Sequence, residues 1–261
     1  MRALDIAATG MSAQQMRVEV ISNNLANMST TGYNARRAEF ADLHYQQIQP
    51  PGAVNASDGS LVPTGIQLGL GVRPAAVTVM PAQGTLLSSG GDLDFAIDGI
   101  GFLEVTLPSG QSGYTRDGSL KRSPDGLIVT SDGNEGVPGI TIPPDARSIS
   151  VNAQGEVYAY FNDRVDAQLL GQFTLASFTN EKGLQATGSN NFLETPASGP
   201  PTVAVPGQSG LGTLRQGYLE ESSVDPVKEI TDLIEAQRGY ELNAKVITAA
   251  DQMLGATVQI R

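Results

Sequence analysis

The sequence predicts an α+β protein in which two long helices, one at each end of the chain, bracket a central antiparallel all-β domain. Two observations support this class. Apolar residues recur at heptad spacing near both ends, and pairs such as Asp-Gly punctuate the middle at short, regular intervals. Heptads are typical of helices that pack along a narrow seam, whereas regular turns between short alternating runs are typical of antiparallel strands.

The first helix is expected over residues 3–28. A heptad counted from its start is apolar at every seam position except Gln14, and one helix cannot bury such a stripe alone. Gly10 weakens the helix by about 1 kcal/mol relative to Ala, and Gly32 is expected to end it by adopting a positive φ. The seam positions are Leu4, Ala7, Met11, Gln14, Val18, Ile21, Leu25 and Met28.

The second helix is expected to begin after Asp225, with this carboxylate as N-cap and Pro226 at the first helical position. Because each terminal helix has a single seam, the economical arrangement is that the two helices pair with each other as a coiled coil. A helical cap folded back on the β domain is the alternative. The second seam comprises Ile230, Leu233, Gln237, Tyr240, Ala244, Ile247, Asp251, Leu254 and Val258.

Further apolar residues fall outside both seams. Pairing of the two helices would leave them exposed, and exposed apolar surface of this kind implies further copies of the same chain or relatives of it. They are Ile6, Val20, Ile234 and Val246.

The rest of the chain divides into three expected segments. Residues 34–72 form an extended connector that includes a Pro/Gly-rich long hairpin or loop, residues 73–215 form the all-β domain, and residues 216–221 lead back to the second helix. The helical domain therefore combines residues 1–33 with 222–261. Turn pairs mark the β domain at Asp98-Gly99, Asp117-Gly118, Asp125-Gly126, Asp132-Gly133 and Gln154-Gly155.

Composition excludes several classes of protein. A net charge of −11 disfavours binding to nucleic acid or to an anionic membrane, because both need a basic face. Cysteine is absent, which excludes disulfides, thiolate metal sites and cysteine nucleophiles and suits a chain that must be unfolded during export. The N-terminus has no signal-peptide h-region, and no segment is apolar for the roughly 18 residues that a membrane span needs.

Candidate catalytic and metal-binding motifs are weak. The run from Asp92 to Gly99 places carboxylates at alternate positions, but it lacks an oxygen donor at Ala96 and a distal Glu in register for calcium. His44 is the single histidine, no phosphate-binding Gly-rich loop is complete, and no pair of acids can be nominated for glycoside hydrolysis. We therefore expect no catalytic residue, no cofactor and no metal.

Three motifs resemble a known family. Ser22-Asn23-Asn24-Leu25-Ala26-Asn27, followed by Thr31-Gly32-Tyr33, is similar to the signature shared by the rod and hook proteins of the bacterial flagellum. The segment from Gly217 through Lys245 resembles the C-terminal helix of that family. Gly101-Phe102 with Tyr114-Thr115-Arg116-Asp117-Gly118 resembles its β domain. Gly239 replaces the helix-favouring small residue expected there, and it can allow close helix approach.

The resemblance implies a structural subunit rather than an enzyme. Residues 37–43 and the Pro/Gly segment after them look most like the branch that builds the distal rod, a rigid hollow drive shaft that transmits motor torque to the hook and passes exported subunits. Such a subunit leaves the cell through the flagellar type III export apparatus without signal cleavage and polymerises in the periplasm. The implied partners are further copies of the chain, proximal rod proteins, the hook protein and the P-ring and L-ring proteins.

Other functions are also compatible with these residues. The alternatives are another axial subunit, of the hook or the proximal rod, and an exported β-domain enzyme or adhesin. Under the rod interpretation the Asn side chains satisfy buried backbone groups in a tight multi-helix contact. The expected assembly interface comprises Leu4, Met11, Val18, Ile21, Asn23, Asn24, Leu25, Asn27, Gly32, Tyr33, Ile230, Leu233, Ile234, Gln237, Tyr240, Asn243, Ile247 and Leu254.

Overall fold

The computed structural model describes residues 2–50, 64–162, 164 and 166–259. The chain forms two compact units. Unit 1 comprises Met1–Leu25, Arg36–Thr78 and Pro226–Arg261, and unit 2 comprises Ala26–Ala35 and Val79–Asp225. Helices at both chain ends and an antiparallel β centre confirm the predicted α+β class.

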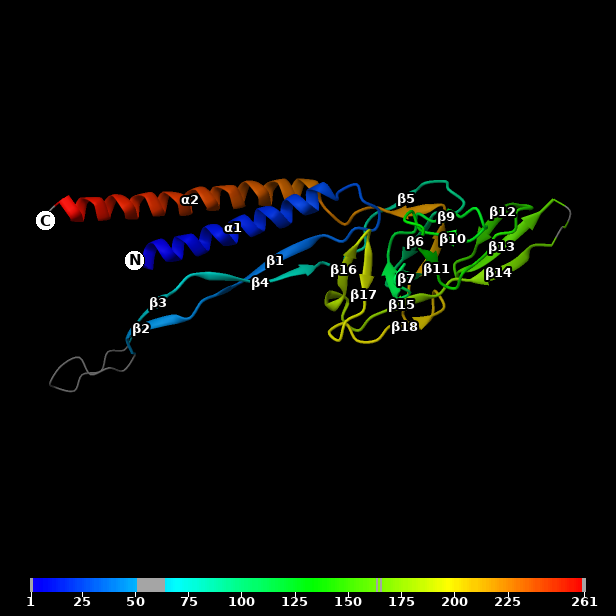
Figure 1. Ribbon diagram of the computed structural model, residues 1–261, viewed down its shortest axis with the longest axis horizontal. Coiled ribbons are helices and arrows are strands. Elements are labelled where there is room, and N and C mark those ends of the chain that lie inside the picture. The colour runs from blue at the N-terminus through cyan, green and yellow to red at the C-terminus, as the bar shows by residue number, and fades with distance from the viewer. Residues whose placement is uncertain (1, 51–63, 163, 165, 260–261) are drawn as a thin grey trace. The chain divides into compact units, whose positions relative to one another are not determined.

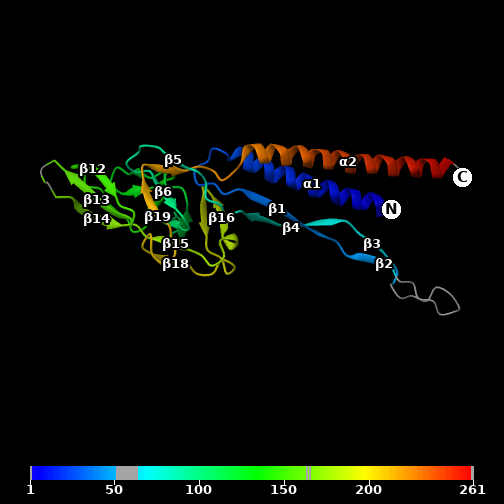
Figure 2. The same cartoon turned by 180° about the vertical axis from the view of Figure 1, so that it is seen from behind.

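Unit 1 contains both helices and four strands. The two helices lie side by side and run in opposite directions, and the strands β1 and β4 follow α1 on its other side (Figure 1). The view from behind shows the same order (Figure 2). The elements are α1 Arg2–Ala26, β1 Arg36–Asp42, β2 Tyr45–Gln49, β3 Ile66–Gly69, β4 Val72–Val79 and α2 Pro226–Gln259.

The helix bounds follow local sequence signals. α2 begins at Pro226, directly after Asp225, as the N-cap pattern predicts. α1 ends at Ala26, two residues before its predicted end, and turns continue to Gly32. Gly32 has the expected positive φ of 66°, but it closes the turns beyond the helix rather than the helix itself.

The strands of unit 1 form two pairings, and the pairing of β2 with β3 is antiparallel. β1 pairs with β4, and β2 pairs with β3. β4 begins where the central β domain was expected to start, yet it pairs with β1 and lies mostly in unit 1, because its alternating residues complete a ribbon beside the helix. The Pro/Gly-rich tip predicted between β2 and β3 falls, over 51–63, outside the described residues.

Unit 2 is built from short antiparallel strands. The largest sheet has nine strands, with β7 near its centre, and a separate three-stranded sheet has the order β12-β13-β14. The elements are β5 Leu86–Ser88, β6 Phe95–Asp98, β7 Phe102–Thr106, β8 Ser112–Thr115, β9 Lys121–Arg122, β10 Ile128–Val129, β11 Glu135–Gly136, β12 Ala146–Val151, β13 Glu156–Phe161, β14 Gln168–Gln172, β15 Leu175–Ser177, the 3₁₀ turn η1 Glu181–Gly183, β16 Gln185–Gly188, β17 Asn191–Leu193, β18 Thr202–Ala204, β19 Thr213–Gln216 and β20 Tyr218–Glu220.

The β7 strand separates two hydrophobic cores in unit 2. Successive side chains of a strand point to opposite faces, so Leu103 enters the larger core, with Phe95 and Phe173, while Phe102 enters the smaller one. Tyr114 on the neighbouring strand also lies in the smaller core, where its ring meets Phe178 edge-on with centroids 4.8 Å apart. Neighbouring apolar residues on this strand therefore contribute side chains to both cores.

The buried phenol of Tyr114 predicts a loss of stability at alkaline pH. Burial, followed by the negative charges of Glu104 and Glu194, raises the pKa of Tyr114 to about 12 from 10.0. The unfolded chain gives up this proton near pH 10 and the folded chain retains it, so the free energy of unfolding should be constant below pH 10 and fall between pH 10 and 12.

Urea unfolding across that pH range checks this expectation. The Tyr114→Phe variant has no proton to lose at this position, and its stability should fall less steeply than that of the wild type between pH 10 and 12. Equal slopes for the two proteins would contradict the assignment.

Candidate assembly site

The two terminal helices contact each other in one antiparallel register. The Arg17 guanidinium of α1 lies 2.7 Å from the Asp232 carboxylate of α2, and the Asn24 amide donates to Glu229 at 3.1 Å. Further along, Gln14 meets Gly239, and Asn243 meets Gly10. As the residue numbers of the contacting positions increase along α1, those of their partners in α2 decrease, which shows that the two helices are antiparallel.

The α1 seam predicted from the heptad is largely turned inward. Ala7 and Ile21 are buried, and the other seam positions within the helix are half-buried. Met28 lies beyond the end of α1 and is 49% exposed, so its place in the seam is wrong. The half-buried members are Leu4, Met11, Gln14, Val18 and Leu25.

The α2 seam is only half correct. Leu233, Ala244, Ile247 and Leu254 are half-buried as predicted, and the Val258 side chain lies outside the described residues. The remaining predicted positions are wrong for the single chain, because the more deeply buried residues Ala236 and Ala250, and the half-buried Asn243, lie on a neighbouring stripe of the helix. Small side chains at these positions let α2 approach α1 closely, and the larger residues are displaced to the flank. The displaced, exposed positions are Ile230, Gln237, Tyr240 and Asp251.

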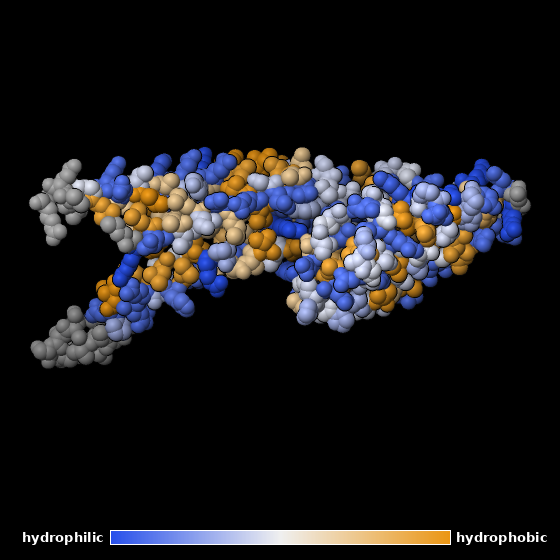
Figure 3. Space-filling view, in the orientation of Figure 1, coloured by the Kyte–Doolittle hydropathy of each residue, from blue (hydrophilic) through white to orange (hydrophobic). Residues whose placement is uncertain are grey.

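Apolar side chains remain exposed on the flanks of α2. Ile230 and Ile234 are each 47% exposed, and with Val227 they form one patch near the start of the helix. Leu242, Val246 and Met253 form a second patch further along. Figure 3 shows hydrophobic surface over the helices on the face that it presents. We call these six residues the α2 apolar flank.

Asn24 joins three elements of unit 1. It is 1% exposed, and its amide accepts from the Arg36 backbone N–H at 2.9 Å and donates to the Arg36 carbonyl at 2.8 Å. The same amide donates to Glu229 of α2. Asn24 thus satisfies backbone groups at the start of β1, and the multi-helix contact expected for the Asn cluster stays a prediction. Asn23 is exposed, whereas Asn27 is half-buried in the turns after α1 and accepts from the Thr30 hydroxyl.

Removing the Asn24 amide should loosen the start of β1. The Asn24→Ala variant leaves the Arg36 N–H and C=O without their partner, at a cost of about 1–3 kcal/mol. Amide hydrogen exchange at Arg36 should therefore accelerate. The matched control is Ser22→Ala, an exposed position on the same helix. Unchanged exchange at Arg36 in the Asn24 variant would refute the bridging role.

Gly32 and Tyr33, the other two predicted interface residues, belong to unit 2. Both are buried. The Gly32 N–H donates to the Glu220 carbonyl at 2.8 Å, and the Tyr33 carbonyl accepts from the Ser223 N–H at 3.0 Å. A β-carbon at Gly32 would lie 2.9 Å from the Arg116 backbone, so only glycine fits. These hydrogen bonds link the end of the turns after α1 to β20 and to the segment that follows it.

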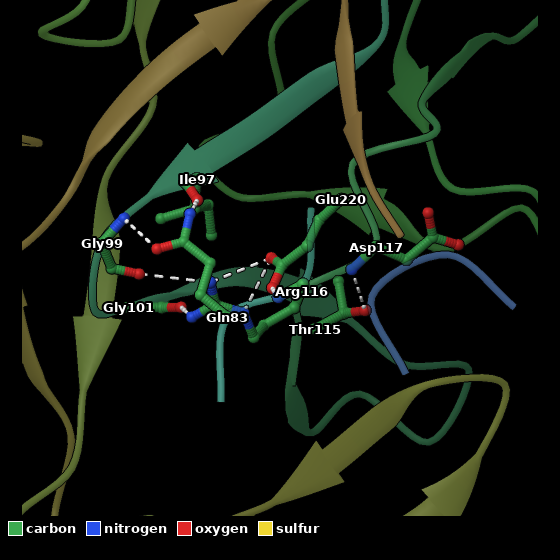
Figure 4. Close-up of polar contacts among 9 residues, drawn as sticks. Gln83, Ile97, Gly99, Gly101, Thr115, Arg116, Asp117 and Glu220 are labelled. Carbon is green, nitrogen blue, oxygen red and sulfur yellow. Dashed lines mark hydrogen bonds and ion pairs between the residues drawn. The ribbon is translucent and has the colours of Figure 1, made fainter. Parts of the chain in front are cut away.

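A buried ion pair stands at the same junction in unit 2 (Figure 4). The Arg116 guanidinium lies 2.9 Å from the Glu220 carboxylate, and the two side chains are 9% and 3% exposed. Arg116 also donates to the carbonyls of Gly99 and Gly101, while Glu220 accepts from the Gly84 N–H. The pair therefore ties β20 to loops from three other parts of the unit.

The sequence motifs contain Arg116 and Glu220 but do not predict that they pair. The two residues are separated by 104 positions, and nothing in either motif names the other as its partner. The sequence likewise does not indicate that Arg17 and Asp232 form an ion pair in unit 1. The one local signal of a helix contact was Gln14, the only polar residue in an otherwise apolar seam.

A cavity of about 150 Å³ lies beside the ion pair, with Gln83, Phe102 and Glu181 in its wall. Partial burial raises the pKa of Glu181, and the charge of Arg116 acts in the opposite direction. Among the described residues, no three His, Asp or Glu side chains gather closely enough to hold a metal ion. No helix in the described part of the chain is long and apolar enough to cross a membrane.

Family models match three parts of the chain. Residues 4–34 match "Flagella basal body rod protein", residues 96–159 match "Flagellar hook protein FlgE/F/G D1 domain", and residues 215–260 match "Flagellar basal body rod FlgEFG protein C-terminal". The two rod matches cover most of α1 and α2, and the middle match covers β7 and β8.

Full-length relatives agree with these matches. The chain is 51% identical to the flagellar basal-body rod protein FlgG of Caulobacter vibrioides, over 100% of both chains. It is 49% identical to FlgG of Agrobacterium fabrum, over 97% of each, and 35% identical to FlgG of Bacillus subtilis, over 100% of this chain and 99% of the relative. The chain belongs to the flagellar basal-body rod protein family.

Membership of the rod family explains the character of the site. Rod proteins are structural axial subunits of the flagellar basal body, so this chain is a structural subunit there. A site made of helix seams and an apolar flank, rather than of converging acids and bases, suits such a subunit. The resemblance seen in the sequence motifs is confirmed.

Proposed function

We propose that this chain is a subunit of the distal rod, which polymerises with its own copies into a rigid, hollow drive shaft. The observation that carries the proposal is the α2 apolar flank, which stays exposed after α1 and α2 have contacted each other. Exposed apolar surface of this extent favours association, and the same chain is the partner present at the highest local concentration in a homopolymer.

In this proposal α1 and α2 pair as an antiparallel coiled coil that forms the inner wall of the tube. The Arg17–Asp232 and Asn24–Glu229 contacts support the pairing, as do the small residues along the α2 face. The remaining predicted interface residues on α2, Ile230, Ile234, Gln237 and Tyr240, then meet neighbouring copies. Their exposure in one chain supports that role.

The proposal includes a route and a set of partners. The chain passes through the flagellar type III export apparatus without signal cleavage and assembles in the periplasm, and its lack of cysteine suits passage as an unfolded chain. It contacts proximal rod proteins, the hook protein and the P-ring and L-ring proteins. The strands β2 and β3 pack between neighbouring copies and stiffen the tube.

A deletion strain tests the proposal. Cells that lack the gene should build basal bodies that stop before the distal rod and should be non-motile, and plasmid-borne wild-type chain should restore both rod and swimming. Electron microscopy of purified basal bodies gives the readout. Complete rods in the deletion strain would refute the function, and rods that lack only the curved hook would favour the alternative role of a hook subunit.

A further inference from the structure

Two glycines on the terminal helices each face a carboxamide of the other helix. An ideal β-carbon at Gly10 of α1 would lie 2.9 Å from Nδ2 and 3.1 Å from Cγ of Asn243. One at Gly239 of α2 would lie 3.1 Å from Cδ of Gln14. On each helix the glycine and the carboxamide residue are one helical turn apart. Antiparallel pairing therefore places Gly10 opposite Asn243 and Gly239 opposite Gln14.

The two glycines are unfavourable choices for an isolated helix. Alanine has a higher helix propensity than glycine at any interior position. At Gly10 and Gly239, however, a methyl group would push into the opposing amide, and the neighbour would have to shift. Gly255 on α2 differs, because a β-carbon there would meet no described atom within 4 Å. Two of these three helical glycines, Gly10 and Gly239, therefore lie where the opposing helix comes close.

Gln14 is also an unfavourable choice for a seam. Its side-chain oxygen Oε1 is buried and has no hydrogen-bond partner among the described residues. Leucine would bury more apolar surface at the same position. A polar residue inside an apolar seam can specify register and orientation at a cost in stability.

We propose that Gly10, Gln14, Gly239 and Asn243 form a lock that fixes the register of α1 against α2. This inference rests on the proposed rod function and deepens it, because a fixed register presents the α2 apolar flank to a second copy of the chain in one position. Each carboxamide occupies the space that the opposing glycine leaves. A slide of one turn in one direction sets Gly10 opposite Gly239 and opens a void. The same slide in the other direction forces the two carboxamides against each other.

Alanine substitution separates close packing from helix propensity. Gly10→Ala and Gly239→Ala should each lower the yield of assembled rods in a complemented deletion strain by about tenfold, through overpacking. Gly255→Ala, the matched control, should leave the yield unchanged or raise it. The double variant Gly239→Ala with Gln14→Ala should recover yield relative to Gly239→Ala alone. Equal yields for all three single variants would overturn the lock.

Cross-linking measures the register directly, because the natural chain contains no cysteine. The pair Gly10→Cys with Asn243→Cys brings two β-carbons near the roughly 3.5–4.5 Å that a disulfide requires. The off-register control is Gly10→Cys with Gly239→Cys, about one helical turn away. After oxidation of the purified full-length chain, which does not require rods to form, we expect an intrachain cross-link in most of the first variant and in little of the second.

Adding Gln14→Leu to both cysteine pairs tests the polar residue itself. If Gln14 specifies the register, the in-register preference should fall by about tenfold while an apolar seam remains. An unchanged preference would assign the register to packing alone and overturn the role of Gln14. A dominant interchain product, or equal cross-linking of both pairs, would overturn the lock even where rods form, whereas failure of the wild-type chain to restore rods would instead refute the proposed function.

Discussion

Replacing Arg116 with Leu should lower the free energy of unfolding of unit 2 by about 3–5 kcal/mol, because the substitution leaves Glu220 as an unpaired charge in a buried position. Glu220 is 3% exposed, and the carbonyls of Gly99 and Gly101 lose their donors at the same time. The effect is large because both side chains of the ion pair are buried, and a buried charge that loses its partner is costly.

Urea unfolding followed by circular dichroism measures the change. The matched control is Arg215→Leu, which breaks an exposed pair with Asp98 whose side chains are 52% and 38% exposed, and it should cost less than about 1 kcal/mol. The double variant Arg116→Leu with Glu220→Leu removes both charges and should recover part of the loss. Similar losses for Arg116→Leu and Arg215→Leu would show that the buried pair has no special role.

Replacing Ile234 with Asp should abolish rod assembly while leaving both units folded. Ile234 is 47% exposed in the single chain, so the charge stays hydrated before assembly. Burial of that charge between copies without a partner costs about 3 kcal/mol or more, which raises the critical concentration for polymerisation by about 100-fold or more.

The matched control for Ile234→Asp is Gln252→Asp, which adds the same charge at an exposed polar position of the same helix. It should retain swimming and rods in a complemented deletion strain, whereas Ile234→Asp should lose both with an unchanged circular dichroism spectrum. Normal rods in the Ile234→Asp strain would exclude the α2 apolar flank from the interface between copies.

The sequence predicted those parts of the fold that depend on local pattern. The start of α2 at Pro226 follows from the Asp-Pro signal, and the strands of unit 2 follow from alternation between turns. The backbone partner of Asn24 could be anticipated in kind, because a carboxamide beside a helix end offers both a donor and an acceptor. That this partner is Arg36 depends on where β1 runs after the turn, which no local pattern specifies.

Half of the predicted α2 seam failed for a physical reason. A heptad count weighs large apolar side chains such as Ile230, but the face that approaches α1 contains small and polar residues such as Ala236 and Asn243. Which face of α2 approaches α1 depends on how the surfaces of the two helices fit together. A heptad count considers each helix separately and cannot show that fit. The Arg116–Glu220 pair was missed for a related reason, since contacts between distant segments depend on the tertiary fold.

A three-dimensional reconstruction of the assembled protein by electron cryo-microscopy tests the central claim most directly. We expect a straight, hollow tube in which α1 and α2 of one chain pair antiparallel, with Gln14 opposite Gly239 and with Ile230 and Ile234 buried against neighbouring copies. A tube in which these two isoleucines face water, or in which α1 of one chain pairs only with α2 of another, would contradict the proposed assembly.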